Sequence, residues 1–183
     1  VFPWASGRSS KANPRPADGD WQPAPIPPFT PNPRPELTQP AIREYTGPQP
    51  EHVYIGFLFG GANTREALMA RMVDMILANG EAGLIDLDLV QQQKVLQAYS
   101  YIDENTDYSF HKLYGEPKQG QKLEEVKDLL LGEIEKIKKG EFGDWLLPAI
   151  VQNIKLQRMK DAEKNESRAY NMMGTFVHNI AWE

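Results

Sequence analysis

Proline is the feature that most limits how this chain can fold. Of the 15 prolines, only Pro117 and Pro148 lie beyond residue 50. Proline fixes φ, lacks an N–H donor and biases the residue before it toward extended backbone. Residues 1–40 are therefore predicted to form an extended lead-in, and the packed fold is predicted to occupy residues 41–183 as a single domain.

The lead-in has two interpretations. Its motifs PRP, PAPIPP and TPNPRP are typical of polyproline-like segments, which serve as linkers or as ligands of recognition domains. Trp4, Trp21 and Phe29 could anchor such a segment to the folded part. Because the chain begins at Val1, we expect it to be a piece of a longer, multidomain protein.

Strand patterns predict a mainly antiparallel sheet. Residues 41–46 and 52–59 are two strand-like runs separated by GPQP, and the second run is expected to be buried on both faces. Residues 94–114 alternate, turn near Asn105 and alternate back, which is typical of a β-hairpin. With the helices, the predicted order is β-β-α-α-β-β-α-α-α, an α+β domain with helices packed on one face of the sheet.

Helix patterns occupy the rest of the domain. A helix is predicted over residues 64–79. Asn63 or Thr64 is expected to cap its N-terminus, and Gly80 is expected to end it. A short helix is predicted before the hairpin, and residues 122–140 form the clearest helix. A further helix is expected with Asp144 as its N-cap, followed by a last helix. The core stripe of the first helix is predicted to consist of Met69, Met72, Val73, Ile76 and Leu77.

Composition excludes several classes of protein. The net charge is −5 with no concentrated basic face, so nucleic-acid binding is not expected. Cysteine is absent, which rules out disulfides and thiolate metal sites within the chain. No apolar run approaches the roughly 18 residues that span a bilayer, so no membrane span is expected in this segment.

No catalytic or metal residue is predicted. His52, His111 and His178 lie far apart in the sequence, and neither HxxEH nor HExxH occurs. Asp86 and Asp88 would point about 200° apart on a helix and would not converge on one ion. Ser100 has no histidine near it in the sequence, and nucleophilic catalysis needs a base beside the nucleophile.

Tyrosines crowd the predicted hairpin, at positions 99, 101, 108 and 114. Cross-strand aromatic pairs stabilise sheets, which is the structural interpretation. The functional interpretation is a surface that contacts a peptide. Tyr99 and Tyr101 are the candidate peptide-contact residues.

The order of segments resembles a known family. GDWQPAP, a strand pair, TREALMARMVDMILANG, AGLIDLDLVQQQKVLQAYSY and QKLEEVKDLLLGEIEKIKKGEF follow one another as in the non-zinc, inactive domain of the insulinase-like (pitrilysin-type) zinc metallopeptidases of bacteria. The resemblance covers residues 19–183. It implies an α+β domain in a two-halved chamber whose zinc is bound by an HxxEH domain elsewhere in the parent protein.

The resemblance also implies where this domain belongs. In many members, the far half carries an arginine and, a few residues on, a tyrosine that assist at the zinc site. The matching segment here is LDLVQQQKVLQAYSY, where Tyr99 could match the tyrosine but Val90 or a glutamine stands at the arginine position. The broken pair favours a domain adjoining the zinc domain.

The expected role is therefore a non-catalytic domain that helps to enclose the peptide substrate of a zinc endopeptidase. Its partners would be the other domains of the same polypeptide and the peptide. Two alternatives stay open: a domain that completes an active site on another chain, and a peptide-binding module unrelated to proteolysis. A bacterial cell-envelope or periplasmic location is one expectation for the parent, and this chain itself is expected to bind no cofactor.

Overall fold

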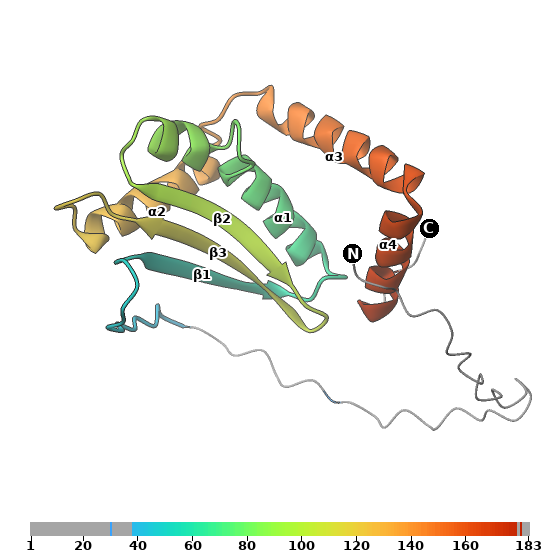
Figure 1. Ribbon diagram of the computed structural model, residues 1–183, viewed down its shortest axis with the longest axis horizontal. Coiled ribbons are helices and arrows are strands. Elements are labelled where there is room, and N and C mark those ends of the chain that lie inside the picture. Colours follow the sequence, from blue (N-terminus) through green and yellow to red (C-terminus); the bar gives the residue numbers. More distant parts are fainter. Residues whose placement is uncertain (1–29, 31–37, 179, 181–183) are drawn as a thin grey trace, which may run out of the picture. The chain divides into compact units, whose positions relative to one another are not determined.

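A three-stranded antiparallel sheet with helices on one side forms the body of the domain in a computed structural model of the chain (Figure 1). The structure describes Thr30, residues 38–178 and Ile180. The strands are β1 (Val53–Gly60), β2 (Gln97–Glu104) and β3 (Tyr108–Glu116), in the order β1-β3-β2. This confirms the predicted α+β class and the hairpin; the proposed anchors Trp4, Trp21 and Phe29 lie outside the described residues.

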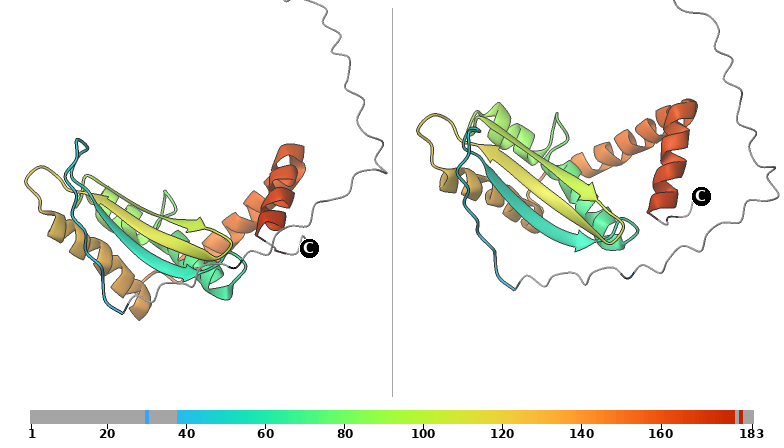
Figure 2. Two further views of the ribbon diagram at one scale, coloured as in Figure 1. Left: turned by 90° about the horizontal axis from the view of Figure 1, so that it is seen from below. Right: turned by 60° about the horizontal axis from the view of Figure 1, so that its bottom comes forward.

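The described part of the chain also contains five helices, of which α1 and α2 lie against the same face of the sheet (Figure 2). The short helix before the hairpin is a π-helix, a form with hydrogen bonds one residue wider than in an α-helix. No helix in the described part is long and apolar enough to cross a membrane. The helices are α1 (Arg65–Leu77), η1 (Asp86–Gln91), α2 (Leu123–Lys139), α3 (Leu146–Glu163) and α4 (Asn165–Val177).

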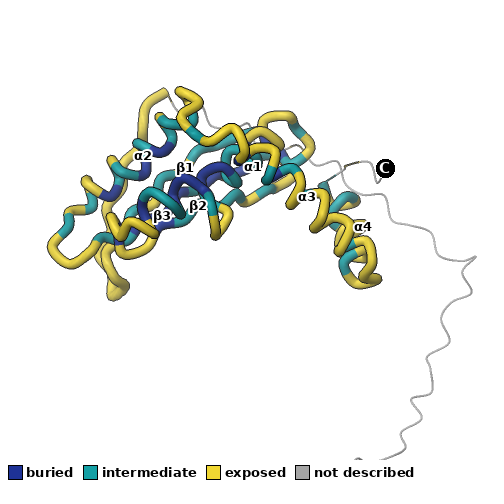
Figure 3. Tube along the Cα trace, turned by 90° about the horizontal axis from the view of Figure 1, so that it is seen from above, coloured by how far each residue is buried: buried dark blue, intermediate teal, exposed yellow. Residues whose placement is uncertain are grey.

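The core lies between β3 and the helices α1 and α2. Side chains alternate across a strand, so Ser109, His111, Leu113 and Gly115 of β3 point toward the helices and are buried. Figure 3 shows the buried trace concentrated there, while α3 and α4 are largely exposed. The main cluster of buried apolar side chains comprises Leu77, Ile85, Leu89, Val95, Ala98, Leu113, Val126 and Leu130.

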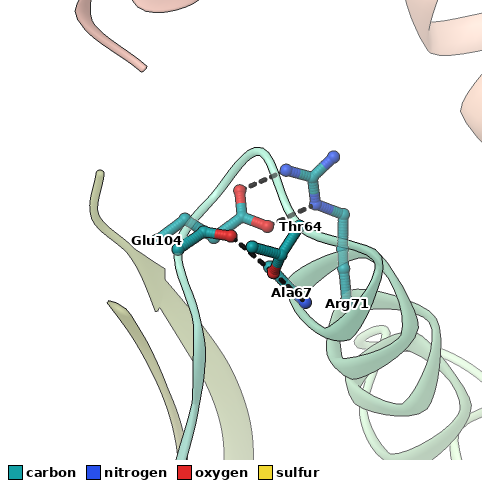
Figure 4. A network of polar contacts seen from close by, with 5 residues as sticks. Thr64, Ala67, Arg71 and Glu104 are labelled. Atoms are coloured by element: carbon teal, nitrogen blue, oxygen red, sulfur yellow. Dashed lines mark hydrogen bonds and ion pairs between the residues drawn. The ribbon is translucent and has the colours of Figure 1, made fainter. Parts of the chain in front are cut away.

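Helix α1 is positioned by its cap and by an ion pair (Figure 4). The Thr64 hydroxyl accepts a hydrogen bond from the Ala67 amide at 3.3 Å, which confirms Thr64 as the N-cap. One turn after Ala67, Arg71 donates a hydrogen bond from Nε to the carboxylate of Glu104 at the end of β2, at 3.0 Å. These contacts connect the helix to the sheet at the end where the hairpin turns.

One predicted strand is wrong. Residues 41–46 form no strand in the structure, and Ile42 and Tyr45 are 76% and 89% exposed. Prolines flank the run on both sides, at 40, 48 and 50, and each removes a backbone donor that strand pairing would need. The edge of β1 consequently has no strand beside it among the described residues.

Three finer expectations also differ from the structure. Strand β1 is covered on one face only, since Tyr54 is 53% exposed. On α1, Met69 is 58% exposed, because the helix approaches the sheet through the small residues Ala67 and Ala70. Helix α3 begins after Trp145, and no side chain caps it, so Asp144 is not the N-cap.

Helix α2 matches its prediction closely. It buries Val126 and Leu130 against the sheet, places Glu124 and Glu125 in its first turn, and carries lysines in its last turn. These charges oppose the partial charges of the helix ends. Gly140 ends the helix in the left-handed conformation with φ 72°, which glycine adopts without a Cβ clash.

Two glycines in the sheet offer a matched test of its two faces. A Cβ at Gly115 would lie 2.5 Å from Val126 Cγ1, whereas a Cβ at Gly56 would meet nothing within 4 Å. We expect Gly115→Ala to lower the free energy of unfolding by about 1–3 kcal/mol through overpacking. Gly56→Ala should leave it unchanged or raise it slightly. Urea denaturation measures both, and equal effects would contradict the described packing.

Candidate functional site

The face of the sheet opposite α1 and α2 is covered by none of the described helices (Figure 2). We call it the open face. Because β1 and β2 both pair with β3 in register, side chains from the three strands form rows across it. Its main side chains are Tyr54, Leu58, Tyr99, Tyr101, Asp103, Tyr108, Phe110, Lys112, Tyr114 and Glu116.

Three tyrosines, one from each strand, form a continuous aromatic row. Tyr54 and Tyr99 are the register partners of Tyr114, with ring centroids 4.9 Å and 4.6 Å from its ring. His52 packs beside the row, 5.3 Å from Tyr54. Tyr114 is therefore only 8% exposed although it lies on the open face, while Tyr54 stays 53% exposed.

The next rows hold a cation among aromatic rings. Lys112 Nζ lies 5.2 Å from the ring centroid of Tyr101 and 5.8 Å from that of Phe110. Its ammonium also forms an ion pair with Asp103. Both distances fall within the roughly 6 Å range of cation–π attraction.

The surroundings of the open face shift three pKa values. Burial, helped by the hydrogen bond to Glu116, raises the pKa of the Tyr114 phenol. Burial and the hydrogen bond with Tyr54 raise the pKa of Tyr99. The hydrogen bond to Asp103 raises the pKa of Lys112, although burial opposes it. Because all three pKa values are raised, the phenols of Tyr99 and Tyr114 are neutral and Lys112 is charged at neutral pH.

The structure places the candidate residues Tyr99 and Tyr101 on the open face, 6.0 Å apart between ring centroids. Sequence reasoning missed Tyr54 and Lys112 as members of the same surface. The alternation of VYIGFLFG gave a usable signal for Tyr54, because it places that residue opposite Val53, Ile55 and Phe57. In YSFHKLYGE the face of Lys112 is rich in aromatic residues and the buried face includes Ser109 and His111, so the pattern of that strand did not reveal the open face.

A buried polar cluster lies on the other face of the sheet. Ser100 donates to Asp74 Oδ1 at 2.6 Å, and His111 Nε2 lies 3.1 Å from the same oxygen. The sequence did not reveal that Ser100 and His111 share a partner, since Asp74 comes from α1. The Asp74 carboxylate lies between the Ser100 hydroxyl and the His111 imidazole. His111 therefore cannot take the serine proton as a catalytic base would. His111 is 2% exposed, and the cluster connects α1 to the sheet.

The two aspartates of η1 diverge, as expected. Asp86 Oδ2 accepts hydrogen bonds from the backbone N–H groups of Asn79, Gly80 and Gly83 at 2.9–3.1 Å. Asp88 instead forms an ion pair with Lys136 of α2 at 2.5 Å. Each carboxylate therefore has its own structural partner.

Zinc does not fit the described residues. Within Thr30, residues 38–178 and Ile180, no three histidine, aspartate or glutamate side chains are grouped so that they could hold a metal ion. His111 is held by Asp74, and His52 packs against tyrosines. No step of a hydrolytic reaction can be assigned to this part of the chain.

The described residues combine a buried core on one face of the sheet with an aromatic face that no described helix covers, and no catalytic group has been assigned among them. Comparison with known families agrees: the family described as "Peptidase M16 inactive domain" matches residues 9–154. The chain belongs to this family, and it is a non-catalytic domain of a protease family. The catalytic partner domains of the family bind zinc.

A solved structure shares the fold. "The crystal structure of a protease from Helicobacter pylori" aligns with a TM-score of 0.65 and 21% sequence identity, over 70% of this chain and 31% of that chain. This chain thus spans about a third of the length of that protease. No curated protein matches the sequence significantly.

The role of Asp86 can be tested by removing its carboxylate. Asp86→Ala would leave three backbone donors without their acceptor, and we expect the free energy of unfolding to fall by about 1–3 kcal/mol. Asp88→Ala is the matched control, because a partly exposed ion pair contributes about 0–1 kcal/mol. Urea denaturation measures both; a smaller loss for Asp86→Ala than for Asp88→Ala would contradict the assignment.

Alkaline unfolding tests the environment of Tyr114. Its folded pKa is raised above the ordinary value of 10.0. The stability that the neutral phenol provides is therefore present below pH 10.0 and is lost as pH rises through the folded pKa. Tyr114→Phe has no proton to lose there. We expect the unfolding free energy of the wild type, relative to Tyr114→Phe, to decline above pH 10.0; a constant difference would contradict a raised pKa.

Proposed function

We propose that this domain helps to enclose the peptide substrate of a zinc peptidase, in which an HxxEH domain of the same polypeptide cleaves the peptide. The observation that carries this proposal is the aromatic row of the open face, which no described helix covers. The parent's peptide and its other domains would be the partners, and zinc would be bound outside this chain.

The exposed fractions of the side chains distinguish rings that pack within the sheet from rings that can contact another molecule. Cross-strand packing accounts for Tyr114, which is almost fully covered, but Tyr54 and Phe110 remain 53% and 37% exposed. Monomeric soluble proteins seldom leave a contiguous set of large rings uncovered without a partner. An exposed aromatic surface therefore supports contact with another molecule.

The chemistry of this surface suits peptides of varied sequence. Tyrosine has a rigid apolar ring and a hydroxyl, so it contacts side chains and peptide groups with little loss of conformational entropy. Tyr99 and Tyr101 lie on β2, an edge strand of the sheet. A peptide on the open face would thus contact both without displacing any described helix.

Two other functions are alternatives to this role. A domain that completes the active site of another chain would need a group that reaches the reacting atoms, and the broken arginine–tyrosine pair argues against it. A binding module unrelated to proteolysis would use the same open face. An HxxEH domain in the parent reading frame would favour the peptidase; a reading frame without one would favour the unrelated module.

Kinetics of the parent peptidase test the enclosing role. We expect Tyr99→Ser and Tyr101→Ser each to raise KM about 3–10-fold, because each removes one ring contact with the bound peptide. The kcat value should stay unchanged, since the proposal gives these residues a role in holding the peptide and none in the chemical step. Tyr170→Ser on α4, at a tyrosine 61% exposed, is the control, and thermal melting verifies that each variant folds.

Other outcomes distinguish the alternatives. A fall in kcat at constant KM would place the tyrosines at the reacting centre and favour the completing role. Unchanged kcat and KM in both variants would show that the open face does not contact the substrate, and would overturn the proposal.

A further inference from the structure

A carboxylate lies beside the middle member of the aromatic row, Tyr114. Glu116 follows Tyr114 by two residues on β3 and lies on the same face, where it accepts the hydrogen bond of the Tyr114 hydroxyl. No lysine, arginine or histidine among the described residues forms an ion pair with Glu116. The row and Glu116 therefore combine ring faces with a negative charge that no described cation neutralises.

Glu116 also lines a groove of about 650 Å³ beside the sheet. The groove lies between residues 44–51 and the segment 116–124 that leads into α2. Its charged lining side chains are four carboxylates and two ammonium groups, a net charge of 2 − 4 = −2, contributed by Glu44, Glu51, Glu116, Glu124, Lys118 and Lys122. A cation beside Tyr114 and Glu116 would meet a negative potential.

The same face already holds one cation in this manner. Lys112 lies over the rings of Tyr101 and Phe110 and is paired with Asp103. Two residues further along β3, the aromatic row and Glu116 provide the same combination of rings and carboxylate. The first position is filled by a lysine of the chain itself. At the second, the His52 ring packs 5.3 Å from Tyr54 and 5.5 Å from Tyr114, and no described lysine or arginine pairs with Glu116.

We propose that the aromatic row and Glu116 bind a lysine or arginine side chain of an extended peptide. The ammonium or guanidinium group lies on the exposed ring of Tyr54 and pairs with the Glu116 carboxylate. A planar guanidinium stacks on aromatic rings and pairs with carboxylates, so arginine should bind better than lysine. At Gly56 the open face has no side chain, and a Cβ there meets nothing within 4 Å, which leaves space for the peptide backbone next to Tyr54.

This inference rests on the proposed function, since it requires a peptide on the open face. Binding of two short peptides to the full chain tests it. The probes are acetyl-Ala-Gly-Arg-Gly-Ala-amide and the same peptide with citrulline, which keeps the shape of arginine and lacks its charge. Ring resonances of the tyrosines in NMR titrations report both the affinity and the place of binding.

We expect the arginine peptide to bind about 5–10-fold more tightly than the citrulline peptide, as a cation–π contact with a nearby carboxylate would give. Tyr54→Leu and Glu116→Gln should each reduce this preference. Tyr170→Leu, on α4, should retain it. Tyr54 and Tyr170 are both more than half exposed, at 53% and 61%, so the two tyrosine substitutions are matched in their effect on folding.

The remaining outcomes separate the two proposals. Equal binding of both peptides, weakened by Tyr54→Leu, would overturn the basic-residue site and still support a peptide-enclosing face. An arginine preference that survives Tyr54→Leu and Glu116→Gln would overturn the site assigned here. Absence of any shift of the open-face tyrosine resonances with either peptide would contradict both proposals.

Discussion

The packing of α1 and α2 on one face of the central strand β3 is the constraint on which the other features depend. Strand β3 pairs with β1 on one side and β2 on the other, so its alternation determines the alternation of the whole sheet. Gly115 permits the close approach of Val126 and Leu130, and Leu113 fills the core beside them. Once these residues point toward the helices, Tyr114, Lys112 and Phe110 must point to the opposite face.

Polar contacts position the parts of this layer but supply no reaction chemistry. Asp74 connects α1 to Ser100 and His111, Asp86 binds the backbone before η1, and Lys136 joins α2 to Asp88. Asp74, Asp86 and Asp88 thus each have a hydrogen-bond or ion-pair partner within the domain. This pattern agrees with the membership of the chain in a family of inactive peptidase domains.

Sequence patterns predicted the helices and the hairpin well because these depend on local spacing. The apolar face of α2, its terminal charges and Gly140 are all within one segment. The same reasoning was wrong for residues 41–46. This short alternating run lies between prolines and pairs with no described strand. It was also wrong for Met69, because the side of α1 that meets the sheet is chosen by how closely the small residue Ala70 allows the helix to approach.

The sequence by itself determined that the first 50 residues are rich in proline and that an α+β domain follows. It also determined that the chain contains no HxxEH motif and no cysteine. Only the tertiary structure decided which residues meet. Tyr54, Tyr99 and Tyr114 come from three strands, and their row exists because β3 lies between β1 and β2. Alternation along one strand defines two faces, but the neighbours on each face depend on strand order and helix placement, which are set by contacts between residues far apart in the chain.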